Sequence, residues 1–181
     1  MKTYHLIMLL ALLSAGSAVA QESRYTSAFN SSNKQSLINS KDLAKTIAGF
    51  KFSRLVKDKE GNISADLNKV LIHQGSFYFK FRLSNRSPIP YDIDFIRFYI
   101  RDLKAAKRTV TQEQEVYPEP VFGKELVAVA PMDRKIKVFR LTKFTVPDDK
   151  ALFIEVYEKN GARHVYLKVS RSDIENARTV K

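Results

Sequence analysis

Hydrophobic and polar residues alternate along several segments of the chain and predict β-strands. The clearest is segment 76–84 (SFYFKFRLS), in which a phenylalanine or leucine occupies every second position. The same period of two recurs in segments 136–144 (IKVFRLTKF), 151–159 (ALFIEVYEK) and 162–170 (ARHVYLKVS). Because successive strand side chains point to opposite faces, each segment predicts a strand with one buried face.

Turn residues separate these segments. Gln74-Gly75-Ser76 lies between a weaker strand at 66–73 and the strand at 76–84, which predicts a hairpin. Asn160-Gly161 predicts a type I′ hairpin between the last two strands. The segment 56–64 (VKDKEGNIS) reads as a polar loop that turns at Gly61-Asn62, and weak alternation over 109–116 suggests one further strand.

About seven short strands with turns between them predict an all-β fold, an antiparallel β-sandwich of the immunoglobulin-like kind. Short flanking helices are expected over 41–50, capped by Ser40, and over 170–177, where Ile174 packs inward. We expect one domain over residues 41–178. The predicted core comprises Phe79, Phe81, Phe98, Ile100, Ile154, Val156 and Leu167.

The first twenty residues have the pattern of a secretory signal peptide. Lys2 precedes an apolar run from Leu6 to Leu13, and Ala18-Val19-Ala20 forms a small-residue cleavage site. The run is too short for a transmembrane helix. We expect cleavage after Ala20, a disordered tether over 21–40 that is rich in Ser and Asn, and a periplasmic or outer-membrane-associated location.

Composition narrows the possible chemistry. The chain has 181 residues, no cysteine and a net charge of +12, which falls to +11 without the signal peptide. Thiol chemistry and cysteine zinc sites are therefore excluded, and the charge favours acidic partners. His73 and His164, the two histidines outside the signal peptide, show no metal-ligand spacing, and no nucleophile elbow or phosphate loop occurs. We expect no enzymatic activity and no cofactor.

The segment 84–102 (SNRSPIPYDIDFIRFYIRD) has two interpretations: it is an ordinary strand of the sandwich, or it is a strand that presents a functional site. Pro88 and Pro90 belong before the strand, which we place over 91–102. Ile96, Phe98 and Ile100 form its expected core face, whereas Phe95, Arg97, Tyr99 and Arg101 form the other face. Asp92 and Asp94 have the spacing of paired carboxylates, but nothing else predicts a cleft for acid–base chemistry. We expect them instead to accept hydrogen bonds from backbone amides or to pair with Arg86, Arg97 or Arg101.

One dense basic cluster, Lys104, Lys107 and Arg108, follows this strand. Such a cluster is typical of a solvated loop. Basic strand faces that carry tyrosines, such as Tyr78 beside Lys80 and Arg82, also occur in proteins that bind single-stranded nucleic acid. Outer strand faces of any basic antiparallel protein look the same, so we expect no direct DNA binding.

Several short words of the sequence together resemble one family. These are Asn85-Arg86-Ser87, YDID at 91–94, RFYIRD at 97–102, AKRTVTQE at 106–113, TKFTVPD at 142–148 and EKNGARH at 158–164. Over about 42–177 the chain resembles the C-terminal region of the conjugative transposon protein TraN. The chain has Leu141-Thr142-Lys143-Phe144 where that family usually has Pro-Lys-Phe, and Ala162 where Gly is common.

The resemblance implies an exported structural subunit of a conjugative type IV secretion apparatus. Its expected partners are outer-membrane core subunits of the channel, among them a lipoprotein, in a large oligomer that associates with the outer membrane through those partners. The expected interface is the exposed side of strand 91–102 with its entry, since aromatic residues and Arg are enriched at interfaces. Its residues are Tyr91, Asp92, Asp94, Arg97, Tyr99 and Arg101. The alternative is a standalone periplasmic or surface module that binds an anionic glycan or nucleic acid.

Overall fold

The computed structural model describes residues 40–103 and 113–180. The chain divides into two compact units, 1–42 and 43–181, and the second unit is described here. The predicted tether and the basic cluster Lys104, Lys107 and Arg108 lie outside the described residues. Among the residues that are described, no helix is long and apolar enough to cross a membrane.

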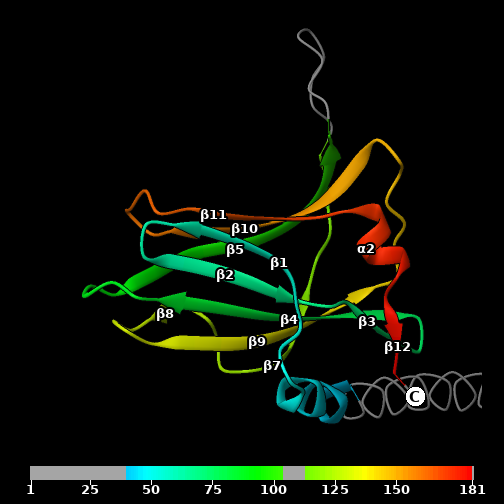
Figure 1. The fold of residues 1–181 in the computed structure, drawn as a ribbon, viewed down its shortest axis with the longest axis horizontal. Helices are drawn as coiled ribbons and strands as arrows, with labels where there is room; N and C mark the ends of the chain where they lie inside the picture. Colours follow the sequence, from blue (N-terminus) through cyan, green and yellow to red (C-terminus); the bar gives the residue numbers. More distant parts are fainter. Residues whose placement is uncertain (1–39, 104–112, 181) are drawn as a thin grey trace, which may run out of the picture. The chain divides into compact units, whose positions relative to one another are not determined.

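Two antiparallel β-sheets pack face to face and confirm the predicted all-β sandwich (Figure 1). The first sheet contains β1 (Arg54–Glu60), β2 (Ile63–Asn68), β3 (Leu71–His73), β4 (Ser76–Asn85), β7 (Glu119–Phe122), β9 (Arg134–Thr142) and β12 (Arg178–Thr179). Strand β4 pairs with β2 and β3 along one side and with β9 along the other. Among the strands that the structure describes, only the β3–β12 pair is parallel.

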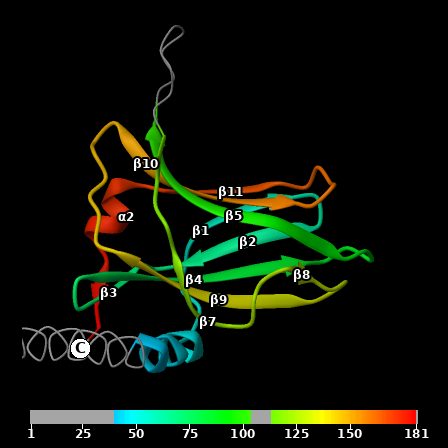
Figure 2. The same ribbon diagram turned by 180° about the vertical axis from the view of Figure 1, so that it is seen from behind.

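The second sheet contains five strands. It consists of β5 (Tyr91–Asp102), β6 (Glu113–Glu115), β8 (Ala128–Val129), β10 (Lys150–Glu158) and β11 (Val165–Val169), in the order β11-β10-β5-β6 with β8 on β5. Figures 1 and 2 show the short helix α2 (Arg171–Glu175) at one end of the sandwich and the β10–β11 loop at the other. Helix α2 has the predicted cap, because Ser170 and Asp173 form a capping box and Ile174 is buried.

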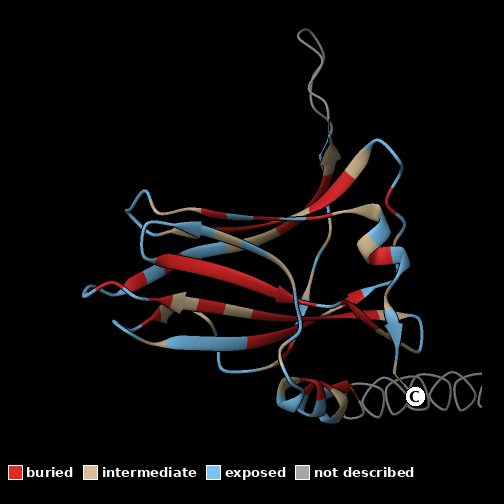
Figure 3. Cartoon of the chain, in the orientation of Figure 1, coloured by how far each residue is buried: buried red, intermediate tan, exposed pale blue. Residues whose placement is uncertain are grey.

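Phenylalanines from both sheets meet in the core. Phe98 of β5 lies edge-to-face against Phe79 of β4 and Phe139 of β9, with ring centroids 6.2 and 5.2 Å apart. All seven predicted core residues are at most 2% exposed. Strand β2 is buried along its whole length, on its outer face as well as its inner one (Figure 3). The alternation of the sequence identifies the inward-facing core residues correctly, but it does not predict that the outer face of β2 is buried as well.

Residues 40–49 are helical, and those of the second unit, 43–49, cover part of the outer face of the first sheet. Ala44 and Ile47 are fully buried in a cluster with Tyr78, Val121 and Val138. The prediction that Ser40 caps this helix is wrong, since Ser40 is already helical. The small cluster seals the outer side of β4 and β9 against water.

Several predicted turns and strands differ from the structure. The expected polar loop at 56–64 is instead most of the β1–β2 hairpin, in which Gly61, at φ 55°, occupies the two-residue turn. The expected strand at 66–73 is split into β2 and β3, and the one at 109–116 is described only as β6. Edge strand β1 is rich in charged residues because one side of it faces water, and its polarity hides it from a hydrophobicity argument.

The predicted hairpin between the last two strands is confirmed, since β10 pairs with β11, but its turn at Asn160-Gly161 is not type I′. Six residues, 159–164, separate β10 from β11, and of the two turn residues only Asn160 has a positive φ, 55°. A type I′ turn needs positive φ at both central residues. The β3–β4 turn meets this condition, with Gln74 at 46° and Gly75 at 70°, so the hairpin predicted there is confirmed.

Candidate interaction surface

Strand β5 changes the face that it presents at a β-bulge. Ile93 pairs with Glu158 and Phe95 pairs with Tyr157, so Asp94 is an extra residue opposite one step of β10. Before the bulge, Tyr91 and Ile93 point into the core and are at most 8% exposed. Beyond the bulge, odd-numbered residues point outward. Unbroken alternation would place Tyr91 on the same face as Arg97. Because of the bulge, Tyr91 lies in the core instead.

The outward side chains of the second sheet form a continuous layer, which we call the aromatic face. Phe95 stacks on Tyr157, with ring centroids 4.5 Å apart, and Tyr157 meets Tyr166 edge-on at 6.2 Å. Further along the strands, Tyr99 stacks on Phe153 at 5.6 Å. Phe95 and Tyr166 are more than 40% exposed, so part of the layer is open to a partner. The aromatic face comprises Phe95, Arg97, Tyr99, Arg101, Phe153, Tyr157 and Tyr166.

Tyr99 and Glu155 form the buried floor of this face. Tyr99 is fully buried and Glu155 is 5% exposed, although both lie on the outer side of the sheet. The Tyr99 hydroxyl donates a short hydrogen bond to Glu155. Burial, followed by this hydrogen bond, raises the pKa of Tyr99 above its usual range. Tyr99 belongs to the predicted interface, but its own chain covers it, so it supports the surface from beneath.

Two arginines of β5 cover this floor and pair with strand β6. The guanidinium group of Arg97 lies 4.6 Å from the Tyr99 ring centroid, and that of Arg101 lies 4.5 Å from the Phe153 centroid. Arg97 Nη2 donates to Glu113 at 2.7 Å, and Arg101 lies 3.7 Å from the same carboxylate. Both arginines stay about one-third exposed, so they remain available to a partner.

Asp92 and Asp94 are exposed, and the expected pairing with arginine is not found. Within the described ranges, no hydrogen bond or ion pair joins either carboxylate to Arg86, Arg97 or Arg101. Arg97 and Arg101 form ion pairs with Glu113 of β6 instead. Asp94 is itself the extra residue of the bulge and Asp92 lies two positions before it, so both add negative charge beside the aromatic face.

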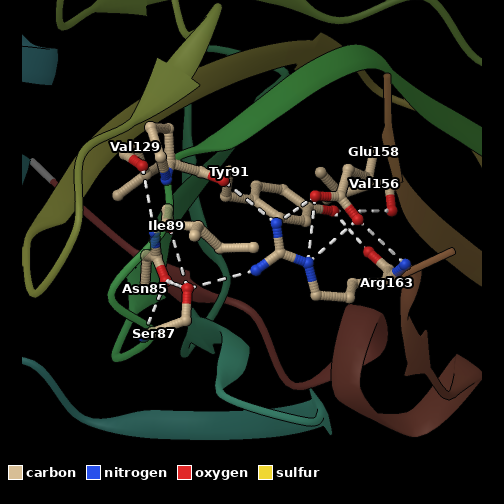
Figure 4. Close-up of polar contacts among 9 residues, drawn as sticks. Asn85, Ser87, Ile89, Tyr91, Val129, Val156, Glu158 and Arg163 are labelled. Carbon is tan, nitrogen blue, oxygen red and sulfur yellow. Dashed lines mark hydrogen bonds and ion pairs between the residues drawn. The ribbon is translucent and has the colours of Figure 1, made fainter. Parts of the chain in front are cut away.

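A polar network centred on Arg163 closes the end of the sandwich near the β10–β11 loop (Figure 4). Arg163 donates to both carboxylate oxygens of Glu158 at 2.9 Å, to Ser87 Oγ at 3.1 Å and to the Pro90 carbonyl at 3.0 Å. Its guanidinium group lies 5.3 Å from the ring centroid of Tyr91. The Tyr91 hydroxyl in turn donates to the Arg163 carbonyl at 2.8 Å.

Asn85 and Ser87 connect this network to the loop before β5. Asn85, which is 1% exposed, donates to the carbonyls of Ile89 and Val129 at 2.8 and 3.1 Å. Its side-chain oxygen accepts from the backbone N–H and the hydroxyl of Ser87. We call Asn85, Ser87, Tyr91, Glu158 and Arg163 the Arg163 network. It fixes the β4–β5 loop, the β10–β11 loop and β8 relative to one another.

The electrostatics of the network favour its charged form. The hydrogen bond from Arg163 lowers the pKa of Glu158, and the same bond raises the pKa of Arg163. Burial raises the pKa of the Tyr91 hydroxyl, which stays protonated and donates. Each member therefore serves as a fixed donor or acceptor near neutral pH.

Four residues of the site, Glu158, Arg163, Phe153 and Tyr157, are not predicted from the sequence. Their partners lie many residues away along the chain, such as Ser87, which is 76 positions from Arg163. The signal was present in the words Asn85-Arg86-Ser87, YDID and EKNGARH, which each supply at least one member of the network. These words, read separately from the sequence, meet at one place in the fold.

The two histidines have local roles. His73 Nδ1 lies 2.8 Å from the Val180 carbonyl, and the His164 ring tilts against Tyr157 with centroids 4.4 Å apart. In the part of the chain that the structure describes, no three His, Asp or Glu side chains are placed to hold a metal ion.

Fold and site together define a two-sheet β-sandwich module with an aromatic outer face and a loop end fixed by an arginine network. A family model described as "Domain of unknown function (DUF4138)" matches residues 21–179, and the chain belongs to that family. No curated protein and no solved structure was found to match this sequence.

Proposed function

We propose that this protein is an exported structural subunit of a conjugative type IV secretion apparatus, similar to TraN, which acts through protein–protein contacts in the outer-membrane core. The observation that carries the proposal is the collinear resemblance over 42–177. Three of its words, Asn85-Arg86-Ser87, YDID and EKNGARH, contribute residues to one hydrogen-bonded network, as expected if they belong to one folded domain. The family match starts at Gln21, directly after the predicted signal peptide, which is compatible with export.

The aromatic face is the surface that this subunit would present to a neighbour. Aromatic residues and Arg are enriched at protein interfaces and dominate their binding energy. Phe95 and Tyr166 supply exposed apolar area, and their stacking on Tyr157 orders them before a partner arrives. Side chains that are already ordered lose little entropy on binding, which strengthens association.

The test uses the double variant Arg97→Ala with Arg101→Ala, purified from cells that express the other channel proteins. We expect a folded domain that no longer co-purifies with those proteins and no longer supports DNA transfer. Truncating one partner of a desolvated charged hydrogen bond at an interface costs about 2–5 kcal/mol. A soluble, folded double variant that assembles and transfers DNA normally would overturn the assignment.

Glu113→Gln is the matched control. It weakens the same intrachain ion pairs but leaves both arginines for a partner. We expect this variant to assemble and transfer DNA like the wild type. Neighbouring genes give an independent check, because a run of conjugation genes supports the proposal and a glycan-utilisation cluster supports the binding-module alternative.

A further inference from the structure

A cationic cavity opens on the outer face of the first sheet, away from the aromatic face. It has a volume of about 410 Å³, within the usual range of small-molecule sites. The cavity lies over β1, β2 and β4, beside the β4–β5 loop and the start of β9. Five cationic side chains line it: Arg54, Lys57, Arg82, Arg86 and Arg134.

Strand register brings these residues into two neighbouring rows. In one row Lys57 of β1 pairs with Asp66 of β2, which pairs with Arg82 of β4. Two residues further along, Ser64 pairs with Ser84, and Ser84 pairs with Arg134. Residues two apart on a strand share a face, so both rows lie on the same surface. Ser64 and Ser84 also line the cavity, where their hydroxyls add donors between the cationic walls.

The two carboxylates that line the cavity are already paired with cationic side chains. Asp66, which is 3% exposed, binds Arg54 at 2.6 Å and Arg82 at 3.1 Å. Asp133 binds Lys135 at 2.6 Å, and Lys135 is not part of the lining. Across residues 40–103 and 113–180, the side chains of Lys57, Arg86 and Arg134 form no ion pair within 4.0 Å of a carboxylate, because Asp66 and Asp133 pair with Arg54, Arg82 and Lys135. The cavity therefore has an excess of positive charge.

The walls are held in place before any ligand binds. The guanidinium group of Arg82 lies 4.0 Å from the Phe52 ring centroid and donates two hydrogen bonds to Asp66. The Arg86 N–H donates to the Asn62 carbonyl, and the Asn85 N–H donates to the Asp133 carbonyl, both at 2.9 Å. These bonds fix the loops that carry Arg86 and Arg134. A fixed cationic wall pays less ordering entropy on binding.

We propose that this cavity binds a phosphate monoester group. A carboxylate is planar and is satisfied by one bidentate arginine, whereas a phosphate presents three terminal oxygens in different directions. Donors on β1 (Lys57), after β4 (Arg86) and on β9 (Arg134), with serine hydroxyls on β2 and β4, surround a tetrahedral anion from several sides. The site is independent of the aromatic face and does not rest on the proposed secretion role.

The test titrates the mature chain with glucose 6-phosphate, inorganic phosphate and acetate at fixed ionic strength, followed by amide chemical shifts. We expect saturable binding, with shifts centred on Ser64, Ser84, Arg86 and Arg134. Vesicles of phosphatidylcholine with and without phosphatidic acid present the same monoester at a membrane surface. Preference for the sugar phosphate indicates a soluble ligand, and preference for the acidic vesicles indicates a lipid headgroup; both support the phosphate site.

Charge-matched variants separate a site from general attraction. Arg86→Gln with Arg134→Gln should raise Kd at least about tenfold, because two charge-assisted donors are lost. Lys159→Gln with Lys168→Gln removes the same charge from exposed positions in the β10–β11 loop and in β11, and should leave Kd within about twofold. Equal weakening by both double variants, tighter binding of acetate than of phosphate, or no saturation would each overturn the proposal.

Discussion

At the scale of single residues, the side chain of Arg163 links the β10–β11 loop to the β4–β5 loop. Its guanidinium group is the partner of Glu158, whose side chain is 9% exposed. Arg163→Ala should lower the free energy of unfolding by about 2–4 kcal/mol, since it leaves a nearly buried carboxylate without its cation. Urea unfolding monitored by circular dichroism measures this loss.

Arg171→Ala is the control for that experiment. Arg171 also forms two ion pairs, but its partners Asp148 and Glu175 are 89% and 57% exposed. Exposed pairs contribute less than about 1 kcal/mol each. A loss for Arg163→Ala no larger than that for Arg171→Ala would show that the network adds little to stability.

The lowered pKa of Glu158 also predicts how the stability contributed by the Arg163 network depends on pH. Its pKa is lowered in the folded protein, so its contribution is fully present above the unfolded value of about 4.3 and is lost as the pH falls through the folded value. The stability difference between the wild type and Glu158→Gln should therefore be large at neutral pH and shrink in acid below pH ~4. Unfolding curves of both proteins across this range measure it. A difference that grows in acid contradicts this sign.

At the scale of elements, the bulge in β5 sets which side chains reach each face. Deleting Asp94 restores unbroken pairing and turns Tyr91 and Ile93 away from the core. We expect the deletion to cost more than about 3 kcal/mol, the cost of losing a large core side chain. Asp94→Ala keeps the residue count at an exposed position and should change stability by less than about 0.5 kcal/mol. Urea unfolding of both variants measures the two free energies of unfolding. Equal values would show that the bulge does not determine which side chains of β5 reach the core.

The same element marks the limit of what the sequence predicts. Period-two alternation is sufficient for β4, β9, β10 and β11, because each has one apolar face, and it correctly places Phe95, Arg97 and Arg101 together. It misplaces Tyr91, since an inserted residue reverses the pattern without any local signal. Asn160-Gly161 fails as a two-residue turn because Arg163 and Glu158 hold a longer loop. Partners 76 positions apart leave no mark on local propensity.

At the scale of the whole molecule, export is the property with the most direct test. The signal peptide pattern predicts that the protein recovered from the periplasm begins at Gln21. Intact mass spectrometry should give the mass of residues 21–181. An intact Met1 in that fraction would refute the predicted cleavage, whereas a cytoplasmic precursor that retains Met1 serves as the mass reference.

The Arg163 network also has a consequence for the order of folding. It joins Ser87 to Arg163 and Tyr91 to Arg163, across 76 and 72 positions of the chain. Contacts of such high sequence separation form slowly, on the scale of about milliseconds to seconds in all-β domains. The network cannot form until β10 and the loop after it are available, so a chain that ends before residue 163 lacks it. The proposed export as an extended chain would therefore require this network to form after the C-terminal strands have crossed the membrane.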